Sequence, residues 1–203
     1  MMIKNIVFDM GNVLLDYDPA RIVRKIIPDA ADAGQIFKAL FQSRGWQLLD
    51  LGLITFDEHY QNIVKQSPRY SREIQWILNN WYTDQPLVPG IEDIVAVLRN
   101  AGFPLYILSN ANLQFYTYAP KKAVFKQFCG ITISADLHLI KPQREIYEKF
   151  CQIHNLNPAA CLFIDNMLEN VDAAIDTGWQ AIQFMDSRRL RGDLEELLMR
   201  KLF

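Results

Sequence analysis

The sequence lacks a large charge excess, a long apolar run and a recognisable targeting segment. Its 203 residues carry a net charge of −2, which gives no electrostatic reason to expect nucleic acid or an anionic membrane as a partner. No run of about 20 apolar residues is present, so no transmembrane helix is expected. The N-terminus leads straight into strand-like sequence without an apolar signal core, and we therefore expect a cytoplasmic location.

Cysteine is also scarce, with three residues at positions 129, 151 and 161. An odd number at these wide spacings does not resemble a disulfide framework or a zinc site. We expect all three to be small apolar side chains in a reduced compartment. The chain length itself allows one α/β domain with a modest insertion, and excludes two large domains.

The pattern of apolar residues changes twice along the chain. Residues 3–8 are apolar and β-branched, as is typical of a buried strand, but only helical patterning follows until about residue 85. Strands and helices alternate from there on, which predicts a parallel sheet covered on both faces. We therefore expect an α/β core of residues 1–17 and 86–203 with a helical cap, residues 18–85, inserted after the first strand.

The expected elements can be placed by residue number. Apolar residues three and four apart predict cap helices over 31–41 and 74–81, and residues 55–58 form a capping box at the start of another. The remaining predicted strands are 104–108, 131–134, 161–164 and 179–184, and the remaining predicted helices are 91–101, one near 114, 143–153, 169–176 and 189–201.

Polar side chains follow the predicted strands at the point where each strand ends. In open α/β sheets, ligands bind outside the carboxyl ends of the strands, where the strand order reverses. A parallel sheet would therefore gather these side chains at one edge. They are Asp9, Ser109, Asn110, Lys141, Asp165 and Asn166.

This set of groups has a coherent use in phosphoryl transfer. A carboxylate such as Asp9 can attack phosphorus and form an aspartyl-phosphate. Because the nucleophile and the phosphate are both negative, a cation such as Mg²⁺, held by carboxylate and carbonyl oxygens, must bring them together. A lysine and hydroxyl donors can then hold the phosphoryl oxygens as charge redistributes.

At these residues the sequence resembles the haloacid dehalogenase-like hydrolases. Four segments resemble the four motifs of that superfamily, in the same order and with a helical insertion after the first. The subgroup it resembles most has a helical cap and is similar to small bacterial sugar-phosphate phosphatases. The segments are 6–14 (IVFDMGNVL), 107–110 (ILSN), 140–142 (IKP) with 146–147 (IY), and 163–166 (FIDN) with 170–171 (NV).

The resemblance implies an α/β fold with a Rossmann-like parallel sheet core, and a role for each matched residue. Asp9 is expected to be the nucleophile and a metal ligand, and Gly11 to offer its backbone carbonyl to the metal. Ser109, Asn110 and Lys141 are expected to bind the phosphoryl group, with Lys141 also neutralising the nucleophile.

The fourth motif, Asp165 with Asn166, is expected to complete a Mg²⁺ site. In the cap, Arg44 lies in the segment that would close over the site, and could clamp an anionic substrate.

Two departures from the family pattern matter for the chemistry. Many family phosphatases carry a second aspartate, the general acid and base, two residues after the nucleophile, where this chain has Gly11. Asp16 could reach back to replace it, although a solvated carboxylate is the plainer interpretation. Asn166 stands where an acid usually contacts the metal, and it brings no negative charge.

Three functions remain open at this point. The leading hypothesis is a Mg²⁺-dependent phosphatase that acts on a small phosphorylated metabolite such as a sugar phosphate. The second is a 2-haloacid dehalogenase, which needs no metal and in which Arg44 could receive halide. The third is a catalytically impaired protein that binds a phosphorylated ligand or a protein partner. The sequence predicts neither the identity of the substrate nor the oligomeric state.

Overall fold

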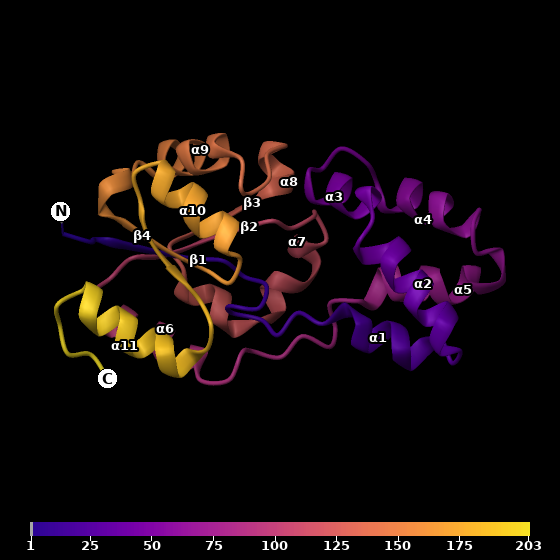
Figure 1. Ribbon diagram of the computed structural model, residues 1–203, viewed down its shortest axis with the longest axis horizontal. Helices are drawn as coiled ribbons and strands as arrows, with labels where there is room; N and C mark the ends of the chain where they lie inside the picture. Colours follow the sequence, from indigo (N-terminus) through magenta and orange to yellow (C-terminus); the bar gives the residue numbers. More distant parts are fainter. Residues whose placement is uncertain (1) are drawn as a thin grey trace.

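The computed structural model describes residues 2–203, and within that range it contains one five-stranded, all-parallel sheet (Figure 1). The strand order is β3-β2-β1-β4-β5, so the chain moves outward from β1 and then returns to its other side. The strand order therefore reverses between β1 and β4. The strands are β1 (Asn5–Phe8), β2 (Leu105–Ser109), β3 (Gly130–Ile133), β4 (Cys161–Asp165) and β5 (Gln180–Gln183).

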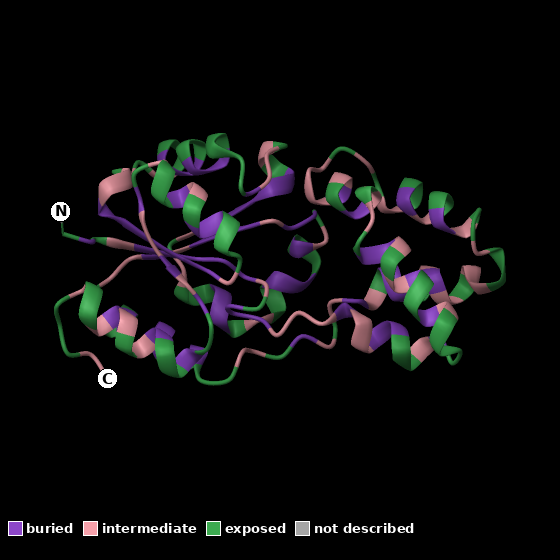
Figure 2. Cartoon of the chain, in the orientation of Figure 1, coloured by how far each residue is buried: buried purple, intermediate pink, exposed green. Residues whose placement is uncertain are grey.

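The central strands β1, β2 and β4 are mostly apolar because both faces of the sheet are covered. Val7 packs with α9 (Arg144–His154) and α10 (Leu168–Asp176). Its neighbours Ile6 and Phe8 point to the opposite face, in the same cluster as α6 (Ile91–Asn100) and α11 (Ser187–Leu197). Figure 2 shows the strands as the most continuously buried part of the chain. The predicted Rossmann-like parallel core is confirmed.

A second group of helices lies beyond the carboxyl ends of the strands and follows β1 in the chain (Figure 1). We call these five helices the cap. The capping box that begins α4 is confirmed, since the backbone N–H of Glu58 donates to Thr55 Oγ1 and Thr55 N–H donates to Glu58 Oε2. The limits of the cap at residues 18 and 85 stay a prediction. Its helices are α1 (Pro19–Ile26), α2 (Ala30–Phe41), α3 (Arg44–Asp50), α4 (Phe56–Val64) and α5 (Ser71–Asn80).

Several local expectations need correction. Residue 134 begins a short helix, α8 (Ser134–Leu137), instead of ending β3. Cys151 and Cys161 are buried as expected, but Cys129 is exposed. The helix expected near residue 114 is α7 (Phe115–Tyr118).

None of the helices formed by residues 2–203 has the length and apolar character needed to cross a bilayer. The remaining short 3₁₀ turns are Pro68–Tyr70, Ala119–Lys121, Ala123–Gln127 and Pro158–Ala160.

The end of α3 is fixed on the core by contacts of its backbone. Ser134 Oγ donates to the carbonyl of Asp50 at 2.5 Å, and the carbonyl of Leu51 lies 2.7 Å from His138 Nδ1. Gly52 has a φ of +64°, and a Cβ there would lie 2.6 Å from the carbonyl oxygen of Ala135. Only glycine allows this close approach without strain, so the residues that follow α3 are held against α8.

This contact predicts opposite effects for two glycine-to-alanine substitutions in the cap. Gly52→Ala should lower the free energy of unfolding by about 1–3 kcal/mol, because the new Cβ meets backbone at a positive φ. Gly34→Ala should raise it by up to about 1 kcal/mol, because position 34 is inside α2 with no atom within 4 Å of the added Cβ. Urea unfolding of both variants would measure the difference, and equal effects would contradict the close approach.

Candidate active site

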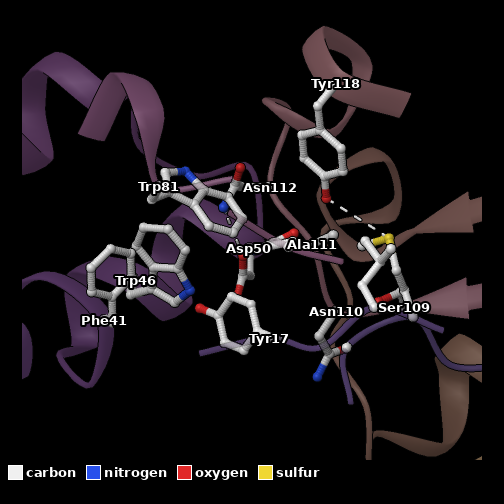
Figure 3. Close-up of a pocket in the computed structure, with 14 residues that line it drawn as sticks. Tyr17, Phe41, Trp46, Asp50, Trp81, Ser109, Asn110, Ala111, Asn112 and Tyr118 are labelled. Carbon is white, nitrogen blue, oxygen red and sulfur yellow. Dashed lines mark hydrogen bonds between the residues drawn. The ribbon is translucent and has the colours of Figure 1, made fainter. Parts of the chain in front are cut away.

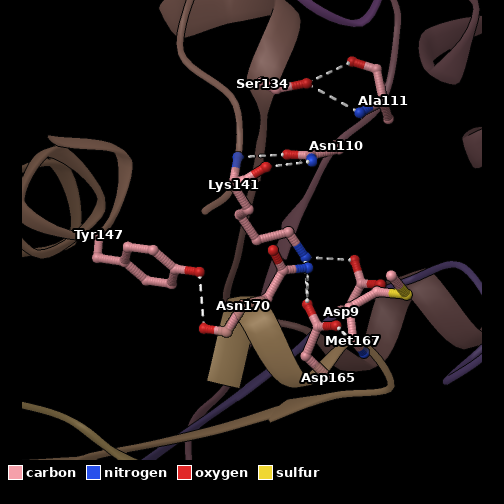
Figure 4. A network of polar contacts seen from close by, with 9 residues as sticks. All are labelled: Asp9, Asn110, Ala111, Ser134, Lys141, Tyr147, Asp165, Met167 and Asn170. Atoms are coloured by element: carbon pink, nitrogen blue, oxygen red, sulfur yellow. Dashed lines mark hydrogen bonds and ion pairs between the residues drawn. The ribbon is translucent and has the colours of Figure 1, made fainter. Parts of the chain in front are cut away.

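The Lys141 ammonium lies between two buried carboxylates at the carboxyl edge of the sheet (Figure 4). Its Nζ donates to Asp9 Oδ1 at 2.8 Å and to Asp165 Oδ2 at 2.6 Å. The side chains of Lys141 and Asp165 are 1% and 0% exposed, and that of Asp9 is 11% exposed. The small exposure of Asp9 makes it the member of this ion trio that a ligand can reach.

The sheet topology brings these three residues together. Asp9 directly follows β1, and Asp165 is the last residue of β4, so they stand side by side at the point where strand order reverses. Lys141 arrives on the loop after α8, with a cis peptide bond to Pro142. Asn110 holds that loop, because its Oδ1 accepts from Lys141 N–H at 2.8 Å and its Nδ2 donates to the Lys141 carbonyl at 3.0 Å. The side chain of Asn110 therefore positions Lys141.

Asp165 is held from a second side by α10. The N–H of Met167 donates to Oδ1 at 2.8 Å, and Asn170 Nδ2 donates to Oδ2 at 3.0 Å. Tyr147 anchors this turn by donating to the carbonyl of Asn170 at 2.9 Å. Both oxygens of Asp165 thus accept protein hydrogen bonds, which fixes its orientation and leaves Asp9 as the less constrained carboxylate.

The electrostatics of the ion trio are unbalanced. With both carboxylates ionised, two negative charges face one positive charge. Burial raises the pKa of Asp9, and the nearby Lys141 opposes this effect. Burial alone would lower the pKa of Lys141, but Asp9 and Asp165 outweigh it and raise that pKa above its usual value. Lys141 therefore stays charged, and the trio carries an excess negative charge whenever both carboxylates are ionised.

The donor set at this edge fits a magnesium ion. Mg²⁺ usually takes one or two carboxylates and completes its shell with water and phosphate oxygens. Asp9 and Asp165 supply two carboxylates with an uncompensated charge, while Gly11 and Asn166 supply backbone or amide oxygens nearby in the chain. Across residues 2–203 no group of three His, Cys, Asp or Glu side chains has metal-binding geometry, so a site built on protein side chains alone is not expected.

A cavity of about 230 Å³ opens between the cap and the ends of the strands (Figure 3). Gly11, Ser109 and Asn110 line its core side: Gly11 lies in the turn that follows β1, Ser109 ends β2 and Asn110 follows it. Asp9 lies next to this lining without forming part of it. The other side is aromatic and amide-rich, with Tyr17, Phe41, Trp46, Asp50, Trp81, Gln85, Asn112 and Tyr118.

The predicted site residues fall into two groups in the structure. Asp9, Lys141 and Asp165 are in direct contact, and Ser109, Asn110 and Gly11 line the adjoining cavity. Asn166 is half-buried beside Asp165, and its backbone carbonyl accepts from Gln183 Nε2 at 3.2 Å. The individual roles of all seven stay predictions.

Arg44 requires a correction. It is exposed, and it lines a separate groove on the cap with Ser43 and His59. The physical reason is the helical period of α3, on which residues four apart share a face. Trp46 and Asp50 share the face that lines the cavity, and Arg44 begins the helix on another face. The substrate-clamping role predicted for Arg44 thus loses its basis.

Asp16 likewise does not reach the site. Its carboxylate accepts from Arg21 at 2.7 Å and is 42% exposed, and it does not line the cavity. The plainer interpretation, a solvated carboxylate, fits these contacts.

Comparison with known proteins agrees with this architecture. The sequence model of the haloacid dehalogenase-like hydrolases matches residues 3–178. The chain belongs to this family. The family resemblance and the hydrolase class expected from the sequence are confirmed.

Two curated relatives are phosphatases, which supports the predicted class of enzyme. A sesquiterpene phosphatase of Aspergillus oryzae is 26% identical over 96% of both chains. A D-ribitol-5-phosphate phosphatase of Bacteroides thetaiotaomicron is 25% identical over 97% of this chain and 99% of that protein. A HAD family enzyme of the same bacterium, solved with magnesium and inorganic phosphate, has a TM-score of 0.71 at 23% identity, covering 91% of this chain and 95% of that one.

Sequence reasoning missed the cap side of this hydrolase's site. Asp50 is the most notable omission, because it is the one acidic side chain among the residues that line the cavity. The signal that could have found it is the spacing of Trp46 and Asp50 on one face of a short helix, but α3 itself was not predicted. Asn170 was part of the fourth matched segment, but its hydrogen bond to Asp165 was not predicted.

The ion trio predicts that Lys141 stabilises the folded hydrolase. Lys141→Met should lower the free energy of unfolding by about 3–5 kcal/mol near neutral pH, because two buried carboxylates are left without a cation. In that variant Asp9 loses the effect of Lys141 that opposes burial, so its folded-state pKa rises further above the unfolded value. Stability should therefore be highest at acid pH, where Asp9 is protonated, and be lost as the pH rises through that folded-state pKa.

Urea unfolding at about pH 5 and about pH 8 would test this sign. Lys149→Met is the matched control, since Lys149 is an exposed residue of α9. A Lys141→Met variant as stable as the Lys149→Met control at both pH values would contradict the account.

Proposed function

We propose that this hydrolase removes phosphate from a small phosphorylated metabolite such as a sugar phosphate, with Asp9 as the nucleophile. The observation that carries this proposal is the Lys141 ammonium between Asp9 and Asp165, at the edge of a cavity lined by Ser109. The two phosphatase relatives support the same reaction class. A cap that covers the cavity favours small substrates over proteins.

The chemistry follows from the groups that Asp9 faces. An Asp9 oxygen attacks phosphorus while the bond from phosphorus to the leaving alcohol breaks, which gives an aspartyl-phosphate and an alcohol. Water then attacks the same phosphorus, releasing inorganic phosphate and restoring the carboxylate. Lys141 offsets the charge of the nucleophile, and Ser109 is proposed to donate to a phosphoryl oxygen.

Magnesium is the proposed cofactor, with Asp9, the Gly11 carbonyl and the Asp165–Asn166 pair as the groups that would hold it. A bound Mg²⁺ would neutralise the excess negative charge and polarise the phosphoryl oxygens. The HAD family enzyme of Bacteroides thetaiotaomicron was solved with magnesium and phosphate, which supports this choice. Asp165 has both oxygens in protein hydrogen bonds, so Asp9 is proposed as the principal charged ligand.

No side chain close after Asp9 in the chain is placed to protonate the leaving alcohol. Gly11 cannot transfer a proton, and Asp16 is paired with Arg21. An alcohol that leaves with a proton taken from water is compatible with this arrangement.

The dehalogenase alternative is less well supported. The two curated relatives described above are both phosphatases. The halide role suggested for Arg44 also loses its basis, because Arg44 lines another groove. Burying the three charges of the ion trio costs desolvation free energy. In a protein that only binds a ligand, that loss of stability would have no explanation.

The partner proposed for this protein is thus the small phosphorylated metabolite itself. A cytoplasmic location, and the absence of nucleic acid and membrane partners, stay predictions.

The test is phosphate release from a panel of small phosphate monoesters with and without Mg²⁺. We expect turnover that needs the metal and that falls about 10³-fold or more in Asp9→Asn. Asp57→Asn is the control, since Asp57 is exposed on α4, and it should behave as wild type. Turnover that persists in Asp9→Asn, or chloride release from a 2-haloacid that is insensitive to chelation, would overturn the proposal.

A further inference from the structure

Asp50 is a carboxylate that the proposed chemistry does not use. It ends α3, and it enters the cavity from the cap side, among Tyr17, Trp46 and Asn112 (Figure 3). Its Oδ1 accepts from Asn112 Nδ2 at 3.2 Å, which is its one side-chain hydrogen bond in the described part of the chain. No ion pair within residues 2–203 involves Asp50.

This position is unfavourable for an aspartate on structural grounds. A carboxylate at the last residue of a helix is close to the negative end of the helix dipole. Burial raises the pKa of Asp50 to about 7, and the hydrogen bond from Asn112 offsets only part of that effect. A group that is costly to bury and has no cation beside it contributes little to the fold. Its presence in the cavity therefore calls for a role in binding.

The protein holds Asp50 in this place from both sides. Ser134 Oγ donates to its backbone carbonyl, His138 contacts the carbonyl of Leu51, and Gly52 approaches Ala135 closely. On the other side Asn112 fixes one carboxylate oxygen, and Asn112 Oδ1 in turn accepts from Gln114 N–H at 3.2 Å. The carboxylate is thus pre-oriented, as a ligand-binding group needs to be.

The surroundings of Asp50 indicate which ligand chemistry fits. Trp46 and Trp81 offer apolar ring surface, and Asp50 offers a hydrogen-bond acceptor. Gln85 also lines the cavity, and its Nε2 is a buried donor without a partner in residues 2–203. A hydroxyl group both donates and accepts, so it can satisfy an acceptor and a donor. An ammonium group would satisfy only the acceptor, and an apolar group neither.

We propose that Asp50 accepts a hydrogen bond from a hydroxyl group of the leaving alcohol, and that the substrate is the phosphate monoester of a polyhydroxylated alcohol. The alcohol lies against the aromatic side of the cavity, with its phosphate toward Asp9 and a distal hydroxyl at Asp50. This inference rests on the proposed function, and it adds the residue that selects the leaving group.

The test compares three phosphate esters in the wild type and in Asp50→Asn. The probes are sorbitol 6-phosphate, p-nitrophenyl phosphate and phosphocholine, with kcat/KM measured in the presence of Mg²⁺. Wild type should prefer sorbitol 6-phosphate. Asp50→Asn should lose about 10- to 100-fold in kcat/KM for that ester, the value of a hydrogen bond to a charged group. Its kcat/KM for p-nitrophenyl phosphate, whose leaving group carries no distal hydroxyl, should change by a much smaller factor.

Asp57→Asn is the matched control, because Asp57 also lies in the cap. A urea unfolding curve of each variant reports on its folding. An equal loss for the hydroxylated and the aromatic ester in Asp50→Asn would show a structural role and overturn the inference. So would a wild-type preference for p-nitrophenyl phosphate or for phosphocholine.

The failure of this inference is distinguishable from failure of the proposed function. If p-nitrophenyl phosphate is hydrolysed in an Asp9-dependent way but hydroxylated esters gain nothing from Asp50, the phosphatase stands and the role of Asp50 falls. If no ester is hydrolysed in an Asp9-dependent way, both are wrong.

Discussion

The ion trio of Lys141, Asp9 and Asp165 is the interaction on which the rest of this structure depends. Three charges are buried at the edge of the sheet, and their mutual attraction must offset the cost of removing them from water. The protein meets this requirement with two hydrogen bonds between Asn110 and the backbone of Lys141, one donated and one accepted by Asn110, and with one that Asn170 donates to Asp165. With both carboxylates ionised the trio has an excess negative charge, which makes the site suited to a cation that could in turn hold a phosphate.

Two regions of the fold form the site: the carboxyl edge of the sheet and the cap. The parallel sheet fixes the chemical groups, because Asp9 and Asp165 follow adjacent strands whose apolar faces are buried on both sides. The cap supplies Phe41, Trp46 and Asp50 to the cavity lining, and the close contact of Gly52 with Ala135 holds the end of α3 against the core.

The core side of the site could be predicted from the sequence, and the cap side could not. Parallel strands end at one edge, so residues that follow them must meet there, whatever the details of packing; this placed Asp9, Lys141 and Asp165 correctly together. Which side chains of a cap helix line the cavity depends instead on where the helix begins and on what it packs against. Since α3 was not predicted, Arg44 was assigned to the cavity that Asp50 lines.

The most direct test of the account is acid quenching of the enzyme during turnover of a ³²P-labelled phosphate ester with Mg²⁺, followed by peptide mapping. The account predicts a transient label on the peptide that contains Asp9, which is absent in Asp9→Asn and disappears as phosphate is released. A label on another residue, or phosphate release without any labelled peptide, would contradict the central role of Asp9.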